Sequence, residues 1–77
     1  MDEKALQKYN ELVKKHELLN ERYAKLEQLE KELEENTTLS DEARLKNLNK
    51  LASEYEKIAN LMQEITKEAQ QLKDSLD

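Results

Sequence analysis

Apolar residues recur along this chain at alternating intervals of three and four, the period of a helix face that packs against another helix. The longest such row is Leu48, Leu51, Tyr55, Ile58, Met62, Ile65, Ala69, Leu72 and Leu76. The first half has a strong row, Ala5, Leu12, Leu19, Leu26 and Leu33, beside a weaker row, Tyr9, His16, Tyr23 and Glu30. The pattern predicts two amphipathic helices of coiled-coil type and argues against a disordered chain.

The periodicity is interrupted once, in the stretch LEENTTLSDEARL of residues 33–45. Ser40 followed by Asp41 and Glu42 is typical of a helix start, because the serine oxygen accepts a hydrogen bond from a free backbone N–H and the acids complement the helix dipole. Asn36 is expected to end the first helix in the left-handed conformation. We therefore predict helices at about residues 2–35 and 41–76, joined by a turn at about residues 36–40.

A turn this short makes the two helices antiparallel neighbours. The predicted fold class is all-α, an antiparallel two-helix hairpin of coiled-coil type that spans residues 1–77 as a single domain. If the numbers of facing residues sum to about 74, Leu26 faces Leu48, and Glu30 forms an ion pair with Arg44 near the turn. Sums nearer 77 or 81 remain alternatives. The absence of glycine and proline agrees with a helical fold, because the tight turns of β-sheets depend on glycine.

Apolar residues extend beyond the narrow stripe that a two-helix seam covers. A chain of 77 residues without cysteine also buries too little surface to be stable without support from disulfides or another chain. We therefore predict that the hairpin is completed to a helical bundle by self-association or by a partner helix. The predicted protein interface is centred on Leu45, Ala52, Ala59 and Leu61, with Leu18 and Leu29 as the alternative.

Catalytic, metal and cofactor sites are not expected. The chain has no cysteine, and its single histidine, His16, has no acid or hydroxyl group placed to orient it. Packing in the seam is the expected role of His16, and a pH-sensitive element is the alternative. Tyr9, Tyr23 and Tyr55 fall at seam positions, so we expect them to pack in the core rather than to stack on nucleic-acid bases.

The 18 acids and 13 bases are interspersed and leave a net charge of −5. No basic patch emerges, so nucleic acids and anionic membranes are unfavourable partners. No apolar run is long enough for a signal peptide or a transmembrane span, and the expected location is intracellular, by default cytoplasmic.

The stretch ARLKNLNKLASEYEKI of residues 43–58 resembles part of the helical N-terminal domain of bacterial peptide chain release factors. The resemblance covers about a quarter of the chain. The glycine-glycine-glutamine motif of that family cannot exist in a chain without glycine, so hydrolytic activity is not implied. Convergent coiled-coil composition accounts for the likeness, and no family is assigned from it.

The expected function is that of a non-enzymatic protein–protein interaction module, such as a small coiled-coil subunit, an adaptor or an assembly chaperone. Its expected partner is a protein, either a second copy or a heteromeric helical chain. The alternative is a small regulator that sequesters one target protein by placing a helix in a groove. An RNA-binding hairpin dimer is disfavoured by the net charge. A designed bundle is disfavoured by the polar seam residues and by a turn without glycine.

Overall fold

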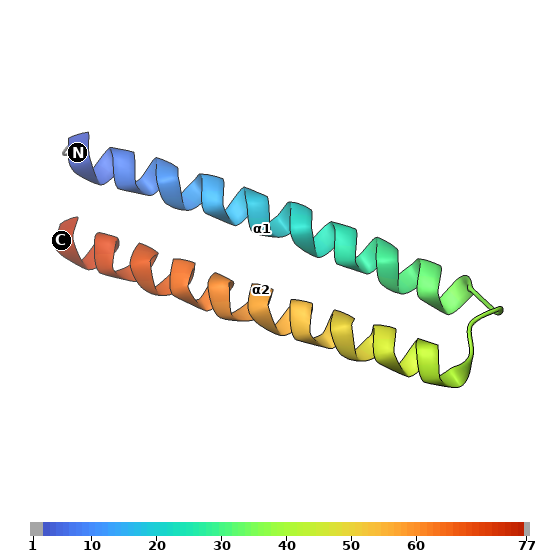
Figure 1. Ribbon diagram of the computed structural model, residues 1–77. Coiled ribbons are helices and arrows are strands. Elements are labelled where there is room, and N and C mark those ends of the chain that lie inside the picture. The colour runs from blue at the N-terminus through green and yellow to red at the C-terminus, as the bar shows by residue number, and fades with distance from the viewer. Residues whose placement is uncertain (1–2, 77) are drawn as a thin grey trace.

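The structure, a computed structural model, describes residues 3–76, which form two long antiparallel helices (Figure 1). Helix α1 spans Glu3–Glu35 and helix α2 spans Asp41–Leu76. The two helices lie side by side along their length, with the turn at one end and the outer ends of both helices at the other. The Cα extents are 56 × 15 × 12 Å. The predicted helical hairpin is confirmed, and the predicted start at residue 2 lies outside the described residues.

Helix α2 begins at the predicted cap. The Ser40 Oγ accepts a hydrogen bond of 3.2 Å from the backbone N–H of Ala43, and the Ser40 carbonyl accepts one of 2.9 Å from the backbone N–H of Arg44. Asp41 and Glu42 occupy the first turn, where negative charge complements the helix dipole. The local sequence therefore determines where the second helix starts.

Helix α1 ends by a different route from the predicted one. No residue from 3 to 76 has a positive φ, so the prediction of a left-handed Asn36 is wrong. Instead, the Asn36 Oδ1 accepts hydrogen bonds from the backbone N–H of Thr38 at 3.0 Å and from its hydroxyl at 2.6 Å. This side-chain turn redirects the backbone, which is why the corner needs no glycine.

The register of the hairpin differs from the predicted one. A sum of 74 predicts that Tyr23 faces Leu51, but Tyr23 lies against Tyr55, with ring centroids 5.3 Å apart. The cross-helix ion pairs agree: Arg22 with Glu54 sums to 76, and Lys15 with Glu68 sums to 83. These contacts fit the alternatives near 77 and 81 rather than 74. Each α2 residue therefore lies opposite an α1 residue a few positions later in the chain than a sum of 74 gives.

The predicted ion pair between Glu30 and Arg44 does not form, as a consequence of this register. The Tyr55 hydroxyl donates a hydrogen bond of 2.8 Å to Glu30 Oε2. Arg44 instead donates from Nη2 to the carbonyl oxygen of Asn36, at 2.7 Å. The guanidinium thereby satisfies a backbone acceptor just after the end of α1.

The core is a single narrow stripe between the helices. Its buried members are Ala5, Leu12, Leu19, Leu33 and Ile58. On α1 these residues belong to one row with a spacing of seven, whereas the neighbouring row with Tyr9, His16 and Tyr23 is exposed. Helix α1 therefore presents its leucine row squarely to α2, and its weaker row lies at the edge of the seam.

Candidate protein interface

The seam divides the hairpin surface into two broad faces, because residues on the two flanks of a buried helical stripe point to opposite sides of the helix pair. The first, here named the tyrosine face, consists of Leu6, Tyr9, Val13, His16 and Tyr23 of α1 with Leu45, Leu48, Ala52, Tyr55, Ala59, Ala69 and Leu76 of α2. The second, here named the ion-pair face, consists of Lys15, Leu18, Arg22 and Leu29 of α1 with Glu54, Leu61 and Glu68 of α2. Two surface grooves show which flank of α1 lies beside which flank of α2. Tyr9 lines one groove together with Ala69, and Leu18 lines the other together with Leu61.

The tyrosine face carries most of the exposed large apolar side chains of the described residues. These are Leu6, Tyr9, Val13, Tyr23, Leu45, Leu48 and Leu76, with exposed fractions from 38% for Val13 to 60% for Leu45. In the two rows of each helix that flank the seam on this side, the charged residues are Glu27, Glu30, Glu34 and Asp41 towards the turn and Lys73 towards the other end. The middle of the face therefore holds no acid, lysine or arginine over several helical turns, and its polar members are His16, Asn20 and Thr66.

One polar contact is built into the edge of the tyrosine face. The half-buried Tyr55 packs on Tyr23 at an interplanar angle of 59° and donates its hydroxyl to Glu30. Partial burial first, then the hydrogen bond and the negative charge of Glu30, raise the pKa of Tyr55 to about 12 from its ordinary value of 10.0. The neutral phenol therefore holds the two helices together at this height.

The sequence predicts that His16 packs inside the seam, but the structure places it outside. It is exposed at the rim of a shallow groove that Tyr9, Val13 and Ala69 also line. Its Nδ1 lies 3.2 Å from Nδ2 of Asn20, one turn further along the same helix. The prediction fails because the leucine row of α1, and not the row of His16, points at α2. Since the imidazole is in contact with water, the predicted alternative of a pH switch driven by burial loses its basis.

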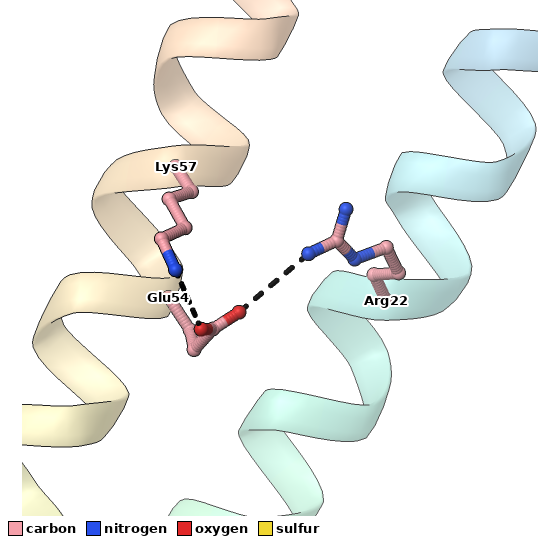
Figure 2. Close-up of polar contacts among 3 residues, drawn as sticks. All are labelled: Arg22, Glu54 and Lys57. Atoms are coloured by element: carbon pink, nitrogen blue, oxygen red, sulfur yellow. Dashed lines mark hydrogen bonds and ion pairs between the residues drawn. The ribbon is translucent and has the colours of Figure 1, made fainter.

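The ion-pair face closes the other edge of the seam with charges (Figure 2). Glu54 of α2 lies between Arg22 of α1 at 3.5 Å and Lys57 of its own helix at 3.2 Å. Lys15 of α1 pairs with Glu68 of α2 at 3.8 Å. The bases that cross the seam lie on α1 and the acids on α2, so this face is electrically complementary within one chain. These side chains are partly exposed, and such pairs contribute only tenths of a kcal/mol to about 1 kcal/mol each.

Two apolar grooves lie along the ion-pair face. One, near the turn, is lined by Leu26, Leu29, Leu33, Leu39 and Leu51 together with polar residues. The other is lined by Leu18, Leu19, Leu61 and Ile65, with Lys15, Arg22 and Glu68 at its rim. Arg22 borders one groove and its partner Glu54 borders the other, so the ion pair interrupts the apolar surface between them.

The residues of the predicted interface fall on both faces. Leu45, Ala52 and Ala59 are exposed on the tyrosine face. Leu61 lies on the opposite flank, because residues two apart on a helix are about 200° apart around its axis. It shares the ion-pair face with the alternative pair, Leu18 and Leu29. The structure therefore separates Leu61 from the alanines with which the sequence grouped it.

Sequence reasoning missed the α1 half of the tyrosine face. The sequence predicts that Tyr9 and Tyr23 pack in the core, but they are 54% and 46% exposed. Leu6 and Val13, which lie beside them, are also exposed. The composition of the row that contains Tyr9 and Tyr23 indicates its exposure, because the row has no aliphatic residue. Tyrosine and histidine favour the boundary between apolar surface and water.

These features define the class of molecule: an all-α helical hairpin of coiled-coil type with one charged face and one uncovered apolar face. The sequence matches no protein-family model, and comparison with curated proteins and with solved structures gave no significant match. Within residues 3–76, neither helix is long and apolar enough to span a membrane. In the same part of the chain, no three histidine or acidic side chains are grouped so that they could hold a metal ion.

Proposed function

We propose that this chain is a non-enzymatic protein–protein interaction module, a small coiled-coil subunit, adaptor or assembly chaperone that binds through its tyrosine face. The observation that carries the proposal is the gathering of exposed apolar and aromatic side chains on that one face. The exposed fraction is 60% for Leu45, 54% for Tyr9 and 47% for Leu6. Exposed apolar surface that gathers on one face of a protein marks interaction sites.

The composition of the face supports a protein as the partner. Tyrosine and leucine line it, while the charged residues that flank it lie towards its ends. Protein interfaces have this anatomy, with aromatic residues enriched in the centre and charged residues depleted there. A nucleic acid requires clustered bases, whereas this chain has a net charge of −5.

The ion-pair face is a weaker candidate for the main contact. Its apolar grooves are interrupted by Arg22 and Glu54, and desolvation of such a pair by a partner costs free energy. No charged pair of this kind crosses the middle of the tyrosine face within residues 3–76. Binding there removes apolar surface from water with little loss of solvation for charges.

A site-specific photo-crosslinker tests the proposal in cells that produce the protein. We expect a photoreactive phenylalanine at Leu48, on the tyrosine face, to give a covalent adduct with a protein chain. The same group at Ser53, on the outer side of α2, is the matched control and should give none. Absence of an adduct from Leu48, or adducts only from Leu18 on the ion-pair face, would contradict the proposal.

A further inference from the structure

The hairpin exposes more surface than a compact protein of its size. Its accessible surface is 6508 Å² for a mass of 9.1 kDa. Folded monomers of that mass expose about 4900 Å², so the excess is about 1600 Å². One broad face of the hairpin, 56 Å by 15 Å between Cα atoms, corresponds to the roughly 800 Å² that each partner buries in an interface of standard size. Covering one face therefore removes a large part of the excess.

The tyrosine face matches itself in shape. Tyr23 contacts Tyr55 and so lies level with the stretch of α2 between Ala52 and Ala59. Tyr9 lines the same groove as Ala69 and so lies level with it. Tyr9 is thus at the height of a small side chain of α2, and Tyr23 is at the height of Tyr55, which has Ala52 and Ala59 about one turn to either side.

A two-fold axis parallel to the helices preserves these heights and lays α1 of one copy on α2 of the other. Tyr9 of each copy then meets Ala69 of the other copy, and Tyr23 enters the space between Ala52 and Ala59. Large residues opposite small ones allow two helices to interdigitate. The reversed arrangement lays α1 on α1 and α2 on α2, which places the tyrosine-bearing rows against each other and alanines against alanines.

The cost of removing charges from water also favours this face for pairing. A two-fold interface brings each residue of a patch against another residue of the same patch in the second copy, so charged side chains there must lose water and leave or share their existing partners. The acids and bases of the ion-pair face already neutralise each other within one chain, across the seam at Arg22 and Glu54 and at Lys15 and Glu68. The middle of the tyrosine face holds no acid, lysine or arginine, so its burial by a second copy avoids that cost.

From these observations we infer that the tyrosine face is covered by a second copy of this chain. The product is a two-fold symmetric four-helix bundle with both turns at the same end. Each helix then has antiparallel neighbours on two sides, the arrangement of a short-loop bundle. The inference rests on the proposed function and names the partner that binds the tyrosine face.

Solution mass with matched variants is the first test. We expect the purified chain to sediment at twice its 9.1 kDa mass. The Ala52→Glu, Ala59→Glu double variant should sediment as a monomer and stay helical, because both positions are exposed and glutamate is a good helix former. Ser53→Glu with Asn60→Glu adds the same charge at the same spacing on the outer side of α2, and should remain a dimer. A wild-type monomer up to millimolar concentration, or a dimeric alanine-site variant, would overturn the inference.

A second test determines whether the two turns of the dimer lie at the same end. It uses a substitution in the turn, so the residues of the tyrosine face stay unchanged. The chain has no cysteine, so Thr37→Cys places a single nitroxide label on the exposed turn. With both turns at one end, the label-to-label distance should be about 20–30 Å, a few interhelical spacings plus the label arms. With the turns at opposite ends, it should approach the 56 Å length of the hairpin, and the tyrosine-to-alanine match would be wrong.

The mass of the Leu48 crosslinked adduct separates failure of this inference from failure of the proposed function. An adduct of twice the chain mass supports both. An adduct with a different protein, together with a monomeric purified chain, overturns the second copy as partner and leaves the interaction module standing. No adduct overturns the module itself.

Discussion

The two faces of the hairpin flank one seam and are built from the same two helices, yet they close it by different chemistry. On the ion-pair face, Arg22 and Lys15 reach across to Glu54 and Glu68 in contact with water. On the tyrosine face, an aromatic pair and the hydrogen bond from Tyr55 to Glu30 bridge the helices. The first face satisfies its charges within one chain, whereas the second leaves apolar surface for another chain to cover.

The difference originates in the two rows of α1 beside its buried leucines. One flanking row carries Lys8, Lys15 and Arg22, and the last two pair with acids of α2. The other carries Tyr9, His16 and Tyr23, which are too polar to be buried easily and too apolar to be left in water at no cost. Helix α1 therefore centres its leucine row in the seam and leaves the tyrosine row at the edge.

The largest loss of stability is expected for a substitution in the seam, because the buried residues there support both faces. Ile58 is 3% exposed beneath them, so Ile58→Asp should destabilise the hairpin by about 4 kcal/mol or more, because an unpaired carboxylate would be buried. Leu18→Asp is the control, since Leu18 is 60% exposed on the ion-pair face and its replacement should cost less than about 1 kcal/mol. Thermal and urea unfolding followed by circular dichroism would measure both, and similar losses would mean that Ile58 is not in the shared core.

The turn sets the register that gives both faces their contacts. Ser40→Leu removes the cap oxygen that accepts the Ala43 N–H and should cost about 1 kcal/mol, whereas Ser40→Gly should cost only a few tenths of a kcal/mol. The two unfolding midpoints, measured side by side, check the prediction. If the leucine variant were as stable as the wild type, α2 would not depend on this cap, and Thr38 would be the next candidate.

How far the sequence predicts this molecule depends on whether a feature is local. The helix start at Ser40 was predictable because the cap and the residues it stabilises are adjacent in the chain. The end of α1 was placed correctly but explained wrongly, since Asn36 uses its side chain rather than a positive φ. Periodicity alone also found the buried leucine row.

Register and the identity of the exposed rows were not predictable in the same way, because they depend on contacts between residues 25 or more positions apart. The pairing of Arg22 with Glu54 illustrates the limit. Bases seven apart at Lys8, Lys15 and Arg22, and acids fourteen apart at Glu54 and Glu68, signal a charged edge on each helix. Matching these two rows would have favoured the observed register over a sum of 74, which pairs Glu30 with Arg44.

A pH titration should distinguish the tyrosine face from the ion-pair face. The pKa of Tyr55 is raised to about 12 in the folded chain from 10.0, so its contribution to stability is complete below pH 10 and is lost as the pH rises towards 12. We expect Tyr55→Phe to be modestly less stable than the wild type at pH 7 and to lose less stability between pH 10 and 12. Tyr9→Phe is the matched control, because Tyr9 is exposed and makes no hydrogen bond to Glu30. Identical alkaline profiles for wild type and Tyr55→Phe would show that the contact with Glu30 does not hold in solution.

The smallest effect on stability is expected for the ion pairs of Glu54. It is also the effect that best distinguishes the ion-pair face from the tyrosine face, because added salt should weaken ion pairs and leave the Tyr55 hydrogen bond largely unchanged. Glu54→Gln removes both ion pairs of Figure 2 while preserving the shape of the side chain. Its cost should be only about 0.5 kcal/mol at low ionic strength, since the carboxylate is 39% exposed. In about 1 M salt the Debye length falls to about 3 Å, so the difference from wild type should nearly vanish. The effect of Tyr55→Phe should persist in the same buffer, because a half-buried hydrogen bond is screened much less than an exposed ion pair. A Glu54→Gln penalty that stayed constant with salt would mean that Arg22, Glu54 and Lys57 act through packing, and that the two edges of the seam differ less than their geometry indicates.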